Sequence, residues 1–155
     1  MPSHDEVLAT IREQVAGERD ANRAMTTVVA TLKKTMPDYS WVGIYLLDGN
    51  ELVLGPFEGK PSPHTHIPLG RGICGAAAAE KATIIVDDVN ADPRYLACSL
   101  DTKSEIVVPI MKGGEVLGEI DIDSDRLAAF GAADRQMLEA VAALLAERMT
   151  RLASN

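Results

Sequence analysis

The sequence contains few cysteines, no long hydrophobic run and fewer basic than acidic residues. Cys74 and Cys98 are its two thiols. No apolar run approaches the length that a membrane-spanning helix needs. Lysine and arginine number 15 against 23 aspartates and glutamates, which gives a net charge of -8. A field of that sign repels phosphate backbones and anionic lipid surfaces, so we expect no binding to nucleic acids or membranes.

The N-terminal residues 1–6 lack a basic segment followed by an apolar run, so we expect no secretory signal and a cytoplasmic protein. In that compartment both cysteines are expected to be reduced, and a disulfide between them would be transient and catalytic rather than structural. The length of 155 residues suits a single domain over residues 1–155, with a hydrophobic core that needs no disulfide or metal.

Hydrophobic periodicity predicts helices at both ends of the chain. Strong helix formers with apolar residues at helical spacing extend over about residues 5–34, and Gly17 either bends this stretch or divides it in two. An amphipathic helix is expected over about residues 131–153. A shorter, alanine-rich helix is expected over residues 73–81, after a glycine turn.

The central part of the chain, about residues 40–125, is dominated by strand patterns and turns. Strands are predicted at residues 41–47, 51–57, 82–86, 105–111 and 115–123. Two of the connections are hairpin turns, which indicates a largely antiparallel sheet with helices packed on it, an α+β fold. A long loop over residues 87–100 carries Cys98, and compact domains seldom keep such a loop without a use for it.

Carboxylates concentrate on the last predicted strand. Because side chains alternate along a strand, Glu119, Asp121 and Asp123 are expected on one face, behind Leu117. The other face is expected to present the apolar residues Val116, Ile120 and Ile122. If residues 105–111 pair with this strand as a hairpin, Glu105 lies close to Asp121 and Asp123.

Three interpretations of these acids remain open. They could form a solvated sheet face that serves solubility. They could bind a divalent metal ion, although no ligand spacing here matches a known metal-binding loop, and we assign no metal ligands. They could line a pocket for an ammonium group, with one acid held protonated as a proton donor.

The cysteines favour the third interpretation. Cys98 lies seven residues before Glu105, so both can reach one pocket, and reduction of a sulfoxide needs both a thiolate and a proton donor. The alternative is that Cys98 is simply a half-buried small hydrophobic residue. Cys74, at the start of a predicted helix, is either a resolving cysteine or part of the core. Trp41 and Tyr45 share one strand face, where they either wall a pocket for a methyl group or belong to the core.

Six motifs, taken in their order and spacing, resemble the free methionine-(R)-sulfoxide reductases, which are stand-alone GAF domains. They are Trp41–Tyr45, Leu54–Phe57, Ile67–Gly75, Ala97-Cys98, Ser104–Pro109 and Asp121–Ser124. The resemblance covers nearly the whole chain after the first helix. It implies a GAF-like fold in which long N-terminal and C-terminal helices flank a largely antiparallel sheet.

The resemblance also implies roles for individual residues. Cys98 is the implied nucleophile and Cys74 the implied resolving cysteine. Glu105, Asp121 and Asp123 are implied to hold the ammonium and sulfoxide groups of free methionine-R-sulfoxide, with Trp41 and Tyr45 around its S-methyl group. Thioredoxin as external reductant, the absence of a bound cofactor, a homodimer and a role in oxidative stress follow as expectations.

The chain departs from the family pattern at one position. Many members carry a third cysteine in the loop before the Ile-Pro-Leu-Gly motif, where this sequence has His64. A competing hypothesis is a sensory or regulatory GAF module that binds a small ligand without turnover, because a fold does not determine function. A weaker alternative is a subunit of a larger assembly, with residues 5–34 as its contact helix.

Overall fold

The fold is built on one antiparallel sheet. The computed structural model describes residues 2–96 and 101–149. Within those ranges, six strands pair in the order β3-β2-β1-β6-β5-β4, and every adjacent pair is antiparallel. The strands are β1 (Trp41–Asp48), β2 (Glu51–Glu58), β3 (His66–Pro68), β4 (Ile84–Val86), β5 (Ser104–Lys112) and β6 (Glu115–Ser124). The predicted α+β class and antiparallel sheet are therefore confirmed.

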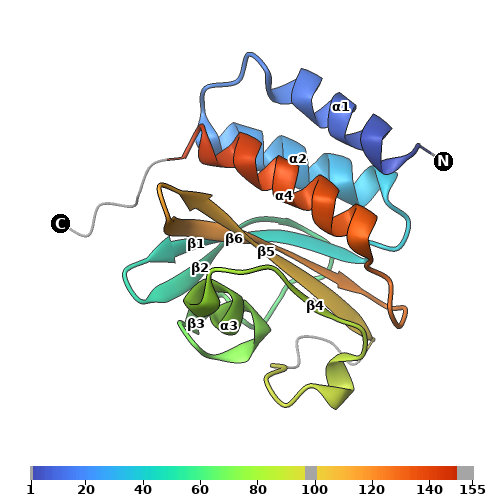
Figure 1. Cartoon of the computed structure of the whole chain (residues 1–155), viewed down its shortest axis with the longest axis vertical. Helices are drawn as coiled ribbons and strands as arrows, with labels where there is room; N and C mark the ends of the chain where they lie inside the picture. Colours follow the sequence, from blue (N-terminus) through green and yellow to red (C-terminus); the bar gives the residue numbers. More distant parts are fainter. Residues whose placement is uncertain (1, 97–100, 150–155) are drawn as a thin grey trace.

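Helices cover the sheet unequally (Figure 1). The helices α1 (His4–Val15), α2 (Ala21–Thr35) and α4 (Ala132–Ala146) lie over one face, and α3 (Gly72–Glu80) lies on the other. A short 3-10 helix, Val89–Ala91, follows β4. Each face of the sheet has its own cluster of buried hydrophobic residues, the larger one beneath the three helices. None of the helices in the described part of the chain is both long enough and apolar enough to span a membrane.

The N-terminal helix expected over about residues 5–34 is divided in two. The first helix ends at Val15, and the second begins after Asp20, whose side chain accepts a hydrogen bond from the Arg23 backbone N–H at 3.2 Å. A side chain that caps the new helix stabilises the break, and Gly17 in the connection has no side chain to order it. Of the two outcomes considered for Gly17, division is the one found.

The C-terminal helix is shorter than the expected 131–153. It ends at Ala146, and the arginine that follows binds carbonyl oxygens of two separate helices. The guanidinium of Arg148 donates to the carbonyl oxygen of Leu144 at 2.6 Å and to that of Val15 at 2.7 Å. These bonds give the carbonyls at the ends of α4 and α1 a side-chain donor and so favour termination there. The expected residues 150–153 lie outside the described part of the chain.

The side-chain alternation predicted for the last strand is wrong at its start. The pairing of β5 with β6 runs Ile110 to Gly118 and then Met111 to Val116, so that Leu117 is an extra residue, a β-bulge. Leu117 consequently joins the core beneath the three helices, and Val116 joins the cluster around α3. The predicted faces hold from Glu119 onward, where the acids begin.

Candidate active site

Four acids form a buried patch on the α3 face of the sheet, which we call the acid cluster: Glu105, Glu119, Asp121 and Asp123. Glu105 is paired directly with Asp123 across β5 and β6, which confirms the expected proximity. The four residues are between 0 % and 5 % exposed. Burial to this degree excludes the interpretation as a solvated sheet face.

The helix α3, which packs on this face of the sheet, brings the thiol of Cys74 to the acid cluster. Cys74 lies in the first turn of α3, is 5 % exposed, and places its Sγ 4.0 Å from Oε2 of Glu105. The next residue in the helix must be glycine, because a Cβ at Gly75 would stand 2.7 Å from the carbonyl oxygen of Pro68. This close approach of backbones fixes the start of α3 against β3 and thereby the position of Cys74.

Burial raises the pKa of each carboxyl group in the cluster, most strongly for Glu105, Glu119 and Asp123. The charge of Asp121 raises the pKa of those three groups further, because like charges in a low dielectric repel. Burial also raises the pKa of Asp121, but hydrogen bonding with Glu105, Cys74 and Asp123 lowers it in part. Burial therefore favours the protonated forms in the cluster, and Asp121, whose pKa is raised least, is its most acidic member.

The same surroundings keep Cys74 protonated. Burial raises the pKa of its thiol, and the charges of Asp121 and Glu119 raise it further. The thiolate is the nucleophilic form of cysteine, so a thiol in this position is poorly suited to begin a reaction. It is better suited to a later step, against an already activated sulfur.

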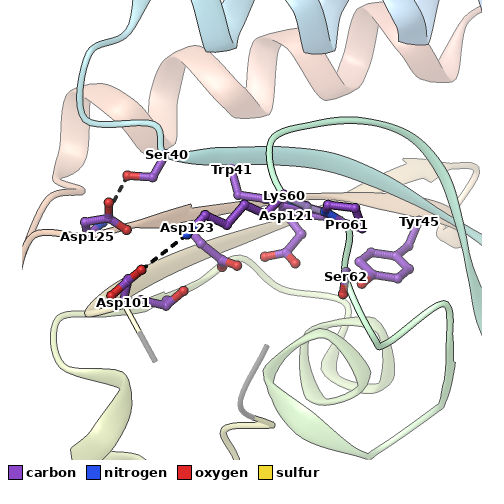
Figure 2. Close-up of a pocket in the computed structure, with 11 residues that line it drawn as sticks. Ser40, Trp41, Tyr45, Lys60, Pro61, Ser62, Asp101, Asp121, Asp123 and Asp125 are labelled. Carbon is purple, nitrogen blue, oxygen red and sulfur yellow. Dashed lines mark hydrogen bonds and ion pairs between the residues drawn. The ribbon is translucent and has the colours of Figure 1, made fainter. Parts of the chain in front are cut away.

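A pocket of about 100 Å³ opens onto the acid cluster. Figure 2 shows the carboxyl groups of Asp121 and Asp123 on the side of the sheet that also carries the ring of Tyr45. The lining residues are Ser40, Trp41, Tyr45, Lys60, Pro61, Ser62, Asp101, Thr102, Asp121, Asp123 and Asp125. Both aromatic residues expected around a methyl group therefore line the pocket, together with two of the three expected acids.

Trp41 is held in place by several contacts. Its indole Nε1 donates to the carbonyl oxygen of Lys60 at 2.8 Å, and its ring stacks on Phe57 with centroids 5.8 Å apart. The ring also covers Gly43, where an added Cβ would stand 2.2 Å from an indole carbon. Tyr45 is held by a hydrogen bond from its hydroxyl to the carbonyl oxygen of His64 at 2.8 Å. The pocket therefore has a fixed aromatic wall beside an acidic floor.

One polar bridge crosses the pocket rim. Nζ of Lys60 lies 3.4 Å from Oδ2 of Asp101, and both side chains are largely exposed (Figure 2). Asp101 and Thr102 come directly after residues 97–100, which lie outside the described part of the chain. The proposed nucleophile Cys98 falls within that segment.

Sequence reasoning left Glu119 out of the site. The alternation that placed Asp121 and Asp123 on one face placed Glu119 beside them, but nothing in the pattern showed that it would be fully buried. It lies between Tyr45 of β1 and Pro109 of β5. The lining residues Lys60, Asp101 and Asp125 were also missed, because loop residues carry no periodic signal.

Comparison with known proteins agrees with this geometry. The family model of the GAF domain matches residues 20–149. The chain is 41 % identical over 128 residues to the free methionine-R-sulfoxide reductase of Saccharomyces cerevisiae, covering 80 % of this chain and 71 % of that protein. It is 37 % identical over 131 residues to the Escherichia coli protein of the same name, covering 84 % and 79 %.

Solved structures give the same result. The free methionine-R-sulfoxide reductase of Neisseria meningitidis, determined in complex with its substrate, superposes with a TM-score of 0.89 at 42 % identity, covering 94 % of this chain and 87 % of that one. Matches of this identity and coverage extend over the sheet, the acid cluster and the flanking helices. The chain therefore belongs to the GAF-domain proteins and, among them, to the family of free methionine-R-sulfoxide reductases.

Proposed function

We propose that the protein reduces free methionine-R-sulfoxide to methionine in the pocket above the acid cluster. The observation that carries this proposal is a set of buried carboxyl groups at the floor of a pocket with an aromatic wall. Family membership supports it, since relatives that match most of the chain bear that name. The substrate carries an ammonium group, a carboxylate, a sulfoxide oxygen and an S-methyl group; the acid cluster suits the ammonium and the sulfoxide oxygen, and the aromatic wall suits the methyl group.

The acids divide the work between binding and proton donation. Asp121, the most acidic member, and Asp123, whose ionised form the substrate ammonium would favour, both reach the pocket and hold the ammonium by charge-assisted hydrogen bonds. Glu105, whose pKa burial raises, remains protonated and donates to the sulfoxide oxygen. Trp41 and Tyr45 surround the S-methyl group. A methionine sulfoxide within a polypeptide lacks the free ammonium, so the site selects the free amino acid.

The chemical step transfers one oxygen atom. The Cys98 thiolate attacks the sulfoxide sulfur, a proton from Glu105 reaches the oxygen, and the oxygen moves to the cysteine sulfur. The products are methionine and a sulfenic acid on Cys98, so the substrate sulfur is reduced and the cysteine oxidised by two electrons. Glu105 regains its proton from solvent.

The second thiol completes the cycle. Cys74 attacks the sulfenic acid, a disulfide forms, and the hydroxyl leaves as water with the thiol proton of Cys74. Thioredoxin then reduces the disulfide, so no bound cofactor is required. Because His64 stands where many relatives have a third cysteine, Cys74 is the one partner within this chain for Cys98.

We also propose a cytoplasmic homodimer, which light scattering would detect as twice the 16.6 kDa chain mass.

A coupled assay tests the proposal. Methionine-R-sulfoxide, thioredoxin, thioredoxin reductase and NADPH are mixed with the protein, and NADPH consumption is followed. Wild type should consume NADPH, and Cys98→Ser should not. A wild-type protein without turnover, or a Cys98→Ser variant as active as wild type, would reject the proposal. Tight ligand binding without turnover would point instead to a sensory module.

Two further variants separate the assigned roles. Asp123→Asn removes one carboxyl group from the ammonium site and should lower kcat/KM about 100-fold or more, within the range for lost charge and proton-transfer interactions. The matched control is Glu115→Gln, an exposed acid on the same strand, which should keep wild-type activity. Cys74→Ser should release one methionine per chain and then slow; undiminished steady turnover would remove Cys74 from the cycle.

A further inference from the structure

The acid cluster and Cys74 have the geometry of a divalent-cation site. Cys74, Glu105 and Asp121 each offer one ligand atom, and these three atoms lie within 4.8 Å of one another. Zinc binds thiolate sulfur at about 2.3 Å and carboxylate oxygen at about 2.0 Å, so tetrahedral ligands stand about 3.3–3.5 Å apart. The observed spacing needs a contraction of at most about 1.5 Å, which side-chain rotations can supply. The ligands come from α3, β5 and β6, so no local sequence spacing reveals them.

Unpaired oxygens in the cluster point independently to a positive ligand. Glu119 is 0 % exposed, and among the described residues neither of its oxygens accepts a well-formed hydrogen bond, although the Cys74 thiol lies near it. Neither Oδ1 of Asp121 nor Oδ1 of Asp123 accepts one from those residues either. Native proteins rarely leave buried carboxyl oxygens without partners, because the desolvation penalty is large. Protons compensate these groups in part, and a dication would compensate them more fully.

The types of ligand atom in the site indicate which metal ion it would bind. Magnesium and calcium prefer six or more hard oxygen ligands, whereas a thiolate with two carboxylates suits zinc or another thiophilic ion. The pocket reaches Asp121, so it gives a path for the ion and room for a water molecule as fourth ligand. A four-coordinate site with three protein ligands and one water is a geometry that zinc commonly takes.

We propose that Cys74, Glu105 and Asp121 bind one zinc ion, which inhibits the enzyme reversibly. The Cys74 thiol gives up its proton to solvent and coordinates as thiolate. The ion then occupies the place of the substrate ammonium and withholds Cys74 from disulfide formation. Inhibition rests on the proposed function, whereas binding of the ion does not.

Cobalt(II) replaces zinc in the test because a cobalt–thiolate bond absorbs light. The Cys98→Ser variant leaves Cys74 as the sole thiol of the chain. One equivalent of cobalt should produce sulfur-to-metal charge-transfer absorption in the near ultraviolet, and zinc should abolish it. Cys98→Ser combined with Cys74→Ser should lack the band, and Asp121→Asn should bind cobalt at least tenfold more weakly. Glu13→Gln, an exposed acid on α1, should bind as the parent does.

Two results would overturn the site: no charge-transfer band, or the same band without Cys74. If removal of Cys74 prevents folding, Asp121→Asn decides, because unchanged cobalt affinity there equally rejects the site. Inhibition is measured on wild type, where zinc should compete with methionine-R-sulfoxide; turnover that zinc does not affect would reject the inhibitory role. Inactivity of the metal-free wild type would count against the proposed function alone, since the cobalt titration requires no turnover.

Discussion

The two sides of the sheet treat buried carboxyl groups in opposite ways. Beneath the three helices, Asp134 accepts hydrogen bonds from the Tyr39 hydroxyl at 2.6 Å and the Gly131 N–H at 2.9 Å, and His4 lies 2.9 Å away. On the other face, Glu119 has no such donor among the described residues. Hydrogen bonding from Tyr39 and Gly131 helps to lower the pKa of Asp134 against the opposing effect of burial, whereas burial raises that of Glu119.

The number of hydrogen-bond donors around a buried acid distinguishes acids that stabilise the fold from acids that are available to bind a ligand. A buried acid with its full set of donors contributes to stability, and a buried acid without donors reduces it. We therefore expect substitutions on the helix-covered face to weaken the protein. Substitutions in the acid cluster should strengthen it while they remove function.

The largest expected effect is on the helix-covered core. Leu138 of α4 is fully buried there, and Leu138→Ala should lower the free energy of unfolding by about 2–5 kcal/mol through lost burial and the cavity left behind. Urea denaturation measures the change, with the exposed Gln136→Ala as control. A loss below about 1 kcal/mol would mean that this face is not the main source of stability.

A smaller effect of opposite sign is expected at Glu119. Replacing it with leucine removes an unpartnered buried carboxyl group, and we expect a gain of about 1–3 kcal/mol at pH 8, in line with replacements of buried charged groups. The folded protein holds a proton on Glu119 that the unfolded chain loses above its ordinary pKa of 4.5. Wild-type stability therefore falls as pH rises above that value.

The pH profile distinguishes this cause from simple core packing. The advantage of Glu119→Leu should be largest in alkaline solution and shrink as the pH falls toward 4. Thermal unfolding at several pH values measures it, with Glu115→Gln on the same strand as the control. An advantage independent of pH would show that charge burial is not its source.

The smallest expected effect concerns Asp134. Its pKa is lowered in the folded state, so its contribution to stability is present above its ordinary value of 3.8 and lost as the pH falls through the lowered value. Asp134→Asn should cost about 1.5 kcal/mol at pH 7, the lower end of the range for a hydrogen bond to a charged group. The difference from wild type should diminish in strongly acidic solution. A constant difference at pH 7 and pH 2 would contradict this account.

Sequence patterns predicted the helices and strands well where the structure depends on residues that are close together in the sequence. The strands around the turn Asp48-Gly49-Asn50 and the acids of β6 follow from alternation and turn residues, both of which are local properties. The bulge at Leu117 does not, because an extra residue depends on how β5 and β6 pair. The break near Gly17 was one of two outcomes that propensity alone could not separate.

The sequence predicted which residues form the site better than it predicted how they are placed relative to one another. Pairing of β5 with β6 gave the neighbourhood of Glu105 and Asp123, since a hairpin fixes which residues are opposite. The approach of Cys74 to Glu105 required the packing of α3 on the sheet, which no spacing encodes. The depth of burial of Glu119 likewise depends on Tyr45 and Pro109, contributed by two other strands.

The missing side chain at Gly43 has a consequence for the range of compounds that the pocket can admit. The indole of Trp41 occupies the space where a methyl group would otherwise project. Any larger residue at position 43 would displace that ring, because an added Cβ would clash with its carbons. In the pocket proposed for the sulfoxide, the space that the indole leaves is thus set by one hydrogen atom on the backbone, although position 43 is not among the residues that line the pocket.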